Sequence, residues 1–177
     1  MTDKPICEIY TDGCCIGNPG RGGYAAILMS PGERKELSGG FRQTTNSRME
    51  LMAAIAGLQT LQHPARVRLY SDSRYLVDAM QRRWAKHWRD RGWRRTGKRR
   101  VENVDLWKQL IELDEKHEVL YVWVKGHDGC PENERCDTLA MQAAMQTNLP
   151  PDRGYETPSP AIPTLFDNPQ PTKRNPR

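Results

Sequence analysis

The sequence has no hydrophobic run long enough to cross a membrane. Its longest stretch without charged or strongly polar residues is 51–58, far short of the roughly 20 apolar residues that a membrane-spanning helix needs. The N-terminus lacks a basic segment followed by an apolar one, so a secretory signal is not expected. These absences predict a soluble, cytoplasmic protein without a membrane partner.

Cysteine and histidine are scarce, with five and four residues, and no two cysteines form a C-x-x-C pair. A chain of 177 residues can bury a core without covalent staples, so we expect reduced thiols. A zinc-binding protein is one alternative. Its soft ligands would be His127, Cys130 and Cys136, with Cys14 or Cys15 as the fourth.

Acidic residues are almost absent from residues 82–100, which contain eight arginines and two lysines against one aspartate, a net charge of +9. The whole chain carries +5 and residues 149–177 carry +1, so the remainder is acidic at −5. Trp84, Trp88 and Trp93 interrupt this basic segment, and indole rings need a surface to pack on. We therefore expect a folded cationic protrusion that grips a nucleic-acid backbone. An ordinary basic helix anchored by tryptophans is the alternative.

Hydrophobic periodicity predicts the order of the elements. Strands are expected over residues 6–12, 22–29, 35–42, 67–71 and 119–124, with a glycine-rich turn over 13–23. Helices are expected over 51–61, through 75–80, and over 104–115 and 133–145, with Thr45 and Asn46 as caps of the first and Asp72 and Ser73 as caps of the second. This order predicts an α/β fold with a mixed sheet covered by helices.

The composition changes near residue 150. Eight of the thirteen prolines lie in residues 150–177, which have little apolar periodicity. We therefore expect a single folded domain over 1–148, which includes the basic segment 82–100, and a disordered proline-rich tail over 149–177.

Four acidic residues stand where a structural role is awkward. Asp12 and Asp72 end strands of apolar or aromatic character, and the ends of adjacent strands in an α/β sheet form ligand sites. Glu50 and Asp137 lie early in helices with apolar stripes. If the four converge, a cation must offset their repulsion. Oxygen ligands favour Mg²⁺ or Mn²⁺, and two ions about 4 Å apart would clamp a phosphodiester for attack by water.

Each acid also has a structural alternative. Asp72 could cap a helix, and Glu50 could be a favourable charge at a helix N-terminus. Asp12 could be a turn residue before Gly13, and Asp137 could be an exposed helical acid.

Five ordered segments resemble ribonuclease H of type 1. They are YTDGCCIGNPG at 10–20, TTNSRMEL at 44–51, YSDS at 70–73, WVKGH at 123–127 and NERCD at 133–137. The resemblance covers residues 5–147 and includes the basic segment. It implies a five-stranded mixed sheet with helices on both faces. It also implies an endonuclease that hydrolyses the RNA strand of RNA–DNA hybrids, such as replication primers and R-loops, and leaves 5′-phosphate and 3′-hydroxyl ends.

The resemblance also assigns roles to individual residues. Asp12, Glu50, Asp72 and Asp137 are expected to bind two Mg²⁺ ions, with Mn²⁺ as a substitute. His127 is expected on a mobile loop, where it assists proton transfer or product release. Asp128 and Cys130 depart from the family pattern beside this histidine, as Ser47 does elsewhere.

Hybrid binding is expected to use seven further residues, namely Cys15, Asn18, Thr45, Asn46, Ser47, Trp84 and Asn103. By resemblance, Thr45 and Asn103 face the DNA phosphate, and Trp84 lies beside the DNA backbone. A monomer is expected, and a non-catalytic hybrid-binding module of the same fold is the alternative. In the tail, Leu165 and Phe166 are similar to peptides with which bacterial replication proteins dock on a sliding clamp.

Overall fold

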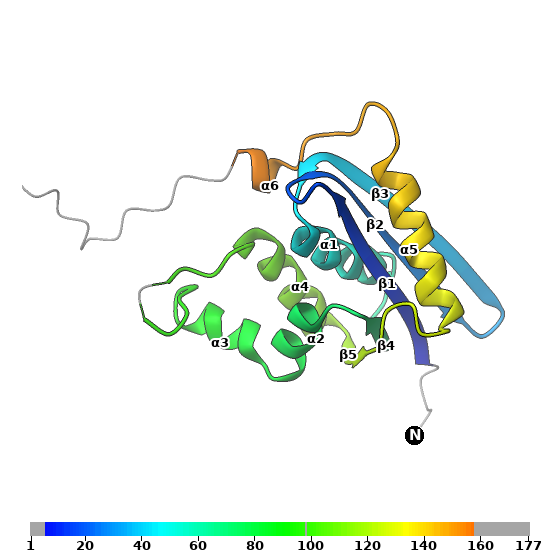
Figure 1. The fold of residues 1–177 in the computed structure, drawn as a ribbon. Coiled ribbons are helices and arrows are strands. Elements are labelled where there is room, and N and C mark those ends of the chain that lie inside the picture. Colours follow the sequence, from blue (N-terminus) through cyan, green and yellow to red (C-terminus); the bar gives the residue numbers. More distant parts are fainter. Residues whose placement is uncertain (1–5, 98, 158–177) are drawn as a thin grey trace, which may run out of the picture.

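The computed structural model describes residues 6–97 and 99–157. Its centre is a five-stranded sheet in the order β3-β2-β1-β4-β5 (Figure 1). The first three strands form an antiparallel meander, whereas β4 and β5 continue the sheet from β1 in parallel. The predicted five-stranded mixed sheet is thereby confirmed. The strands are β1 (Ile6–Ile16), β2 (Gly20–Ser30), β3 (Glu33–Thr44), β4 (Arg66–Ser71) and β5 (Glu118–Trp123).

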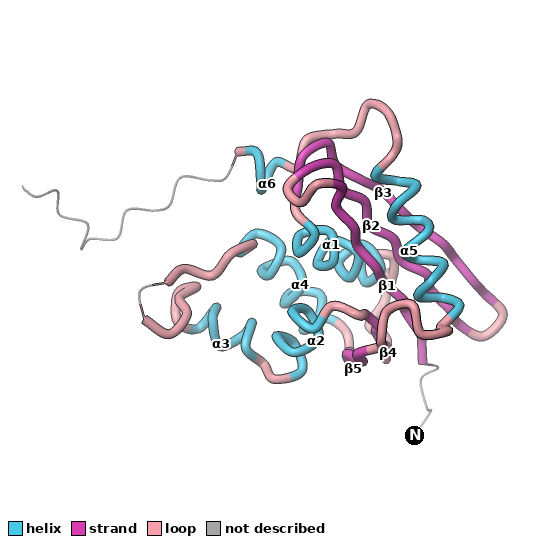
Figure 2. The backbone as a smooth tube through the Cα atoms, viewed as in Figure 1, coloured by secondary structure: helices cyan, strands magenta, loops and turns pink. Residues whose placement is uncertain are grey.

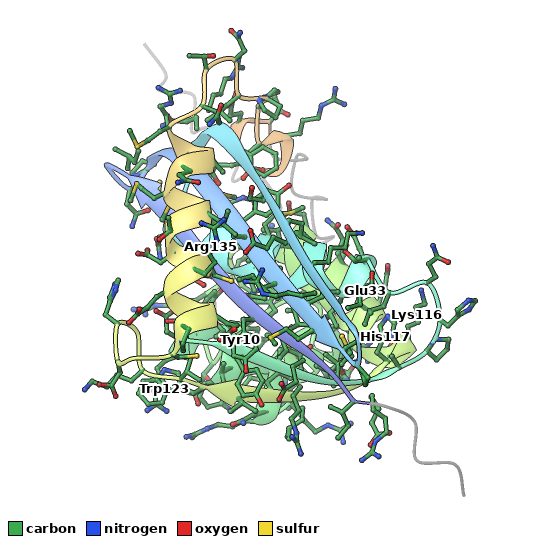
Figure 3. The ribbon with its side chains drawn as sticks, turned by 90° about the vertical axis from the view of Figure 1, so that its right-hand side faces the viewer. Tyr10, Glu33, Lys116, His117, Trp123 and Arg135 are labelled. Carbon is green, nitrogen blue, oxygen red and sulfur yellow. The ribbon has the colours of Figure 1, made fainter. Side chains whose placement is uncertain are left out.

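Helices cover both faces of this sheet (Figure 2). The helix α5 lies across one face, as the view in Figure 3 shows, with Arg135 on its surface paired to Glu36 of β3. The helices α1, α2 and α4 lie on the other face, and α3 projects beyond them. The helices are α1 (Asn46–Gln59), α2 (Arg74–Gln81), α3 (Trp84–Asp90), α4 (Val104–Lys116), α5 (Pro131–Ala144) and α6 (Arg153–Glu156).

Two apolar clusters hold the layers together. The larger lies between the sheet and α1, α2 and α4, and includes Ile9, Ile55 and Trp107, all of them fully buried. The smaller lies under α5 and includes Ile27 and Cys136. Burial of these side chains provides the main driving force for assembling the layers. No helix in the described part of the chain combines the length and apolar character that crossing a bilayer requires.

The predicted glycine-rich turn over 13–23 is wrong in extent, because β1 continues to Ile16 and β2 begins at Gly20. The glycines serve close packing instead. A Cβ on Gly13 would lie 2.4 Å from the backbone nitrogen of Glu50 in α1. A Cβ on Gly23 would lie 1.9 Å from the carbonyl oxygen of Ala140 in α5. The sheet therefore lacks side chains at the points where helices approach it most closely.

The predicted tail is also wrong at its start, because residues 149–157 pack on the domain. The backbone N–H of Arg42 donates to the carbonyl of Pro150 at 2.9 Å, and Asp152 is buried at 5% exposure. Proline enrichment suggested disorder, but here the prolines lead a short folded turn onto β3 and α1. The remaining tail residues, with Leu165 and Phe166, lie outside the described residues.

Candidate active site

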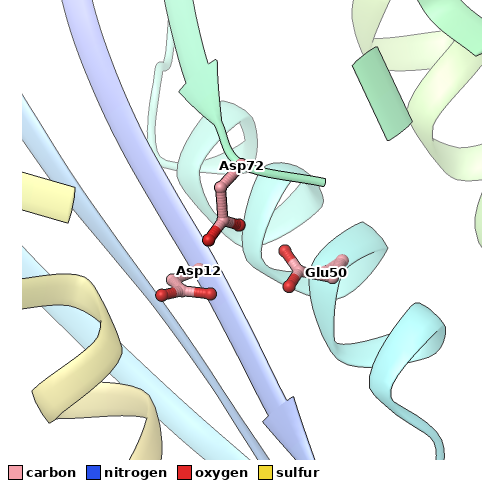
Figure 4. Close-up of side chains that lie close together, drawn as sticks. All are labelled: Asp12, Glu50 and Asp72. Carbon is pink, nitrogen blue, oxygen red and sulfur yellow. The ribbon is translucent and has the colours of Figure 1, made fainter. Parts of the chain in front are cut away.

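Three of the predicted acids converge just beyond the point where the parallel pairing of two adjacent strands stops. The prediction that Asp12 ends its strand is wrong, because β1 continues to Ile16. The parallel pairing of β1 with β4 ends at Tyr10 and Tyr70, and Asp12 and Asp72 each follow this pair by two residues. Glu50 reaches the same point from α1. One carboxylate oxygen of each lies within 4.8 Å of the others, and Figure 4 shows the three side chains directed toward one another. We call Asp12, Glu50 and Asp72 the acid cluster.

Glycines on two sides allow the acid cluster to be this compact. Gly13 lets α1 lie directly against β1, and its N–H donates to Oδ1 of Asp12 at 2.8 Å. A Cβ on Gly126 would lie 2.5 Å from Oδ2 of Asp72. The indole Nε1 of Trp123 donates to the backbone carbonyl of Asp72 at 3.0 Å and fixes the chain after β4.

The electrostatics of the acid cluster call for a cation. Burial, and then the charges of Asp72 and Asp137, raise the pKa of Asp12 to about 7. Burial raises the pKa of Glu50 well above its usual value, with the charges of Asp12 and Asp72 adding to it. Burial is also the largest cause of the raised pKa of Asp72. A divalent cation bound by these oxygens would remove the repulsion.

One atom of the acid cluster has no protein partner. Oε2 of Glu50 is buried and makes no hydrogen bond. A buried carboxylate oxygen without a donor is costly, and a hard cation would satisfy it. The all-oxygen donor set and this unpartnered atom fit Mg²⁺ or Mn²⁺.

Asp137 and His127 lie near the acid cluster but outside its tight group. Asp137 is half-buried on α5, and its charge raises the pKa of both Asp12 and Asp72. His127 is exposed between β5 and α5, with a left-handed φ of 55°. A charge on its imidazole lowers the pKa of Asp72, so the loop faces the site.

The structural alternatives for three acids are wrong. The hydroxyl of Ser73, not Asp72, caps α2 by accepting the N–H of Leu76 at 3.3 Å. Asp12 is inside a strand rather than in a turn. Because α1 begins at Asn46, one turn earlier than its apolar run, Glu50 is beyond the first turn of the helix and is buried.

The zinc alternative is also wrong. Within residues 6–97 and 99–157, the acid cluster is the one group of metal-ligating side chains close enough to share an ion. All five cysteines are free thiols, and Cys136 lies in the core under α5 with its thiol donating to the carbonyl of Tyr10 at 3.3 Å.

Five of the predicted hybrid-binding residues gather where the β1–β2 turn meets the start of α1. Oδ1 of Asn18 accepts the backbone N–H of Asn46 at 3.0 Å, which ties the turn to the helix. The hydroxyl of Thr45 caps α1, and the thiol of Cys15 donates to the neighbouring carbonyl of Thr44 at 3.4 Å. Ser47 is exposed in the first turn of α1.

The other two predicted contacts lie apart from this group. Asn103 is the N-cap residue of α4, with a left-handed φ of 57°, and lines a cavity that Thr45 also lines. Trp84 begins α3 and is 42% exposed. Trp88, by contrast, packs edge-on against the buried Trp107, with ring centroids 5.6 Å apart.

Sequence reasoning missed the buried arginine that supports this surface. Arg48 is 3% exposed and forms ion pairs of 2.7 Å with both Asp105 and Asp152. Its position within the segment 44–51 was visible, but the partners lie more than fifty residues away in sequence. Gly126 was likewise inconspicuous, although its lack of a side chain decides how closely the loop can approach Asp72.

A mixed sheet with an acid cluster just beyond the parallel pairing of β1 and β4 defines an α/β protein with a site suited to divalent metal. The sequence model of the RNase H family matches residues 4–145. Ribonuclease H of Rippkaea orientalis is 60% identical over 157 residues, which cover 88% of this chain and 96% of that protein. Ribonuclease HI of Synechocystis sp. is 55% identical over 141 residues, covering 79% and 88%. This chain belongs to the RNase H family.

A solved structure agrees with this assignment. The crystal structure of LC9-RNase H1, described as a type 1 RNase H with the type 2 active-site motif, is 32% identical. It superposes with a TM-score of 0.71, covering 81% of this chain and 74% of that one. The resemblance found in the sequence is therefore confirmed at the level of family and fold.

Proposed function

We propose that this protein is an endonuclease that hydrolyses the RNA strand of RNA–DNA hybrids. The observation that carries the proposal is the convergence of Asp12, Glu50 and Asp72, whose oxygens lie within 4.8 Å of one another. Membership of the RNase H family gives the substrate class. The products would be 5′-phosphate and 3′-hydroxyl ends, and replication primers and R-loops are the expected cellular hybrids.

The acid cluster would hold the catalytic metal, with Asp137 as a fourth ligand. When bound, two Mg²⁺ ions would supply an activated water and stabilise charge on the scissile phosphate, and Mn²⁺ would substitute for them. The protein's part is to hold the acids in place before the substrate arrives. Two features support this, namely the close approach of Gly13 to α1 and the hydrogen bond from the indole of Trp123 to the backbone carbonyl of Asp72.

His127 is proposed to move a proton near the leaving group or to assist product release. Two features support this role, namely the exposure of its imidazole and its place on the loop that faces Asp72. Asp128 forms a 3.4 Å ion pair with Lys125 on the same loop, so its carboxylate is directed to a lysine of the loop.

The hybrid is proposed to lie across the surface that joins the β1–β2 turn, the start of α1 and the start of α4. Cys15, Asn18, Asn46 and Ser47 would contact the RNA strand, where their polar groups can sense 2′-hydroxyls. Thr45 and Asn103 would contact a DNA phosphate, and the exposed ring of Trp84 would lie beside the DNA backbone. We propose that the protein acts as a cytoplasmic monomer.

The proposal is tested with a labelled RNA–DNA hybrid in the presence of Mg²⁺ or Mn²⁺, next to duplex DNA and duplex RNA of the same sequence. We expect cleavage of the RNA strand of the hybrid alone. Asp12→Asn should abolish cleavage while the protein still binds the hybrid. His127→Ala should lower kcat with a smaller effect on the Mg²⁺ requirement. Cleavage that survives Asp12→Asn would overturn the proposal. A wild-type protein that binds without cutting would instead support the non-catalytic binding module.

A further inference from the structure

A cavity of about 1360 Å³ lies beside the acid cluster, between two segments that are far apart in sequence. One wall is the basic segment, which contributes Arg94 and Arg100. The opposite wall is the C-terminal turn, residues 150–157, which contributes Arg153. Thr45 and Asn103 also line this cavity. None of the four predicted metal-binding acids lines this cavity.

The cavity is cationic. Among the described residues, no ion pair involves Arg94, Arg100, Lys108 or Arg153, all of which line it. Two acids line the cavity. Asp105 is paired with Arg48, and Glu102 forms no ion pair within the described residues. Cations spread over two facing walls create the potential that attracts a phosphate backbone.

Arg153 stands on a fixed support rather than on a flexible tail. The preceding Asp152 accepts hydrogen bonds from Nε of Arg48 at 2.7 Å and from the hydroxyl of Thr44 at 2.7 Å. The following Gly154 has no room for a side chain, because a Cβ there would lie 1.9 Å from Oδ2 of Asp105. The backbone on both sides of Arg153 is therefore anchored to α1 and α4, and its exposed side chain projects from that anchored turn.

We propose that Arg153 contacts a phosphate of the DNA strand and that the C-terminal turn forms the second wall of the channel for this strand. The inference rests on the proposed function. Thr45 and Asn103, the proposed contacts of a DNA phosphate, line this cavity, whereas the acids that would cut the RNA strand do not. The strand beside Arg153 is therefore assigned as DNA, while Asn18 and Ser47, which also line the cavity, would face the RNA strand. The basic segment grips this DNA backbone from one side, and Arg153 holds it from the other.

Arg153→Gln is compared with Arg34→Gln, which removes the same charge at the far end of β3 from Thr44. We expect Arg153→Gln to raise the KM for the hybrid roughly threefold to tenfold, with kcat unchanged. The slope of log KM against log salt concentration should fall by about 0.7–0.9, because one phosphate contact is lost. Arg34→Gln should leave both values unchanged. Arg153→Lys should restore most of the affinity, because it restores the charge.

A second substrate identifies the strand. When methylphosphonates replace the DNA phosphates, wild type and Arg153→Gln should bind with equal affinity. The inference would be overturned if Arg153→Gln still weakened binding of this substrate, or if it behaved like Arg34→Gln on the ordinary hybrid. In either case, cleavage of the hybrid by the wild type would leave the proposed function standing. A wild type that does not cleave the hybrid would overturn both.

Discussion

Arg48 binds both carboxylate oxygens of Asp152, and the two side chains are only 3% and 7% exposed. The pair joins the first turn of α1, beside the acid cluster, to the C-terminal turn 104 residues later. Asp105 completes the network on the other edge of the guanidinium at 2.7 Å. The substrate surface around Thr45 and Asn103 therefore depends on an ion network centred on a buried guanidinium.

Removing one partner of this buried pair should be strongly destabilising. Asp152→Ala leaves the guanidinium of Arg48 with an unpaired edge and the hydroxyl of Thr44 without its acceptor, so we expect a loss of about 3–5 kcal/mol in the free energy of unfolding. Urea denaturation followed by circular dichroism measures it. Glu156→Ala is the control, because it removes the pair with the exposed Arg42 and should cost less than about 1 kcal/mol. If the two variants lost equal free energy of unfolding, the buried Arg48–Asp152 pair would stabilise the protein no more than the exposed Arg42–Glu156 pair.

Gly126 should tune metal affinity through its distance from Asp72. A methyl group at Gly126 would lie 2.5 Å from Oδ2 of Asp72, so the carboxylate must leave the position in which it meets Asp12 and Glu50. We expect Gly126→Ala to raise the Mg²⁺ concentration for half-maximal cleavage by roughly tenfold, equivalent to about 1.4 kcal/mol of binding free energy.

The control for this effect is Gly129→Ala in the same loop. Gly129 has a φ of 78°, so the change strains the backbone, but its added methyl group meets no atom of the described chain within 4 Å. The Mg²⁺ requirement should stay near that of the wild type. If both variants raise it equally, loop strain rather than contact with Asp72 is responsible.

Without metal, the stability of the protein should fall as the pH rises from about 4 to 7. Asp12 has a pKa of about 7 in the folded protein and 3.8 as its ordinary value, so the folded state binds more protons in this window. Its contribution to stability is fully present below pH 4 and is lost as the pH passes 7. Asp12→Asn removes the contribution of Asp12 to this dependence, while Glu50 and Asp72, whose pKa values are also raised, still contribute. The quantity to compare is the free energy of unfolding of Asp12→Asn minus that of the wild type, both in EDTA. This difference should be larger at pH 8 than at pH 4 by on the order of 2 kcal/mol.

Urea denaturation at the two pH values measures this difference, and Glu134→Gln, at an exposed position of α5, is the control. Added Mg²⁺ should reverse the order at pH 8, because it binds the wild-type site and stabilises the folded state. A difference between Asp12→Asn and wild type that is the same at pH 4 and pH 8 in EDTA would contradict the prediction.

The sheet and the acids could be predicted from the sequence because both depend on local pattern. Alternation marks β1 and helical spacing marks α1, while Asp12 and Asp72 stand out as acids that follow apolar or aromatic strand residues. Their convergence follows from the parallel register of Tyr10 with Tyr70, which only pairing of distant segments establishes.

The remaining features depend on contacts between distant segments, which local pattern does not encode. Proline enrichment suggested disorder after residue 148, yet a partner for Arg48 holds the C-terminal turn in place. Similarly, glycines over 13–23 indicated a turn, whereas they mark where helices touch the sheet. Composition describes the conformation that a segment favours alone, and tertiary contacts can stabilise a different one.

Replacing Trp84 and replacing Trp88, both in α3, should have different effects on stability. Trp88 packs on the buried Trp107 and carries the guanidinium of Arg95 5.1 Å from its ring centroid, so Trp88→Ala should lower the free energy of unfolding by about 2–3 kcal/mol. Trp84 is 42% exposed, so Trp84→Ala should change stability by less than about 0.5 kcal/mol.

Hybrid affinity should show the opposite order, because the exposed ring of Trp84 is the one available to the DNA backbone. We expect Trp84→Ala to raise the KM for the hybrid several-fold with kcat unchanged. Urea denaturation and cleavage kinetics on the same preparations separate the two effects. If Trp84→Ala were as destabilising as Trp88→Ala, or left KM unchanged, Trp84 would be a packing residue, and the basic segment would hold DNA by its arginines alone.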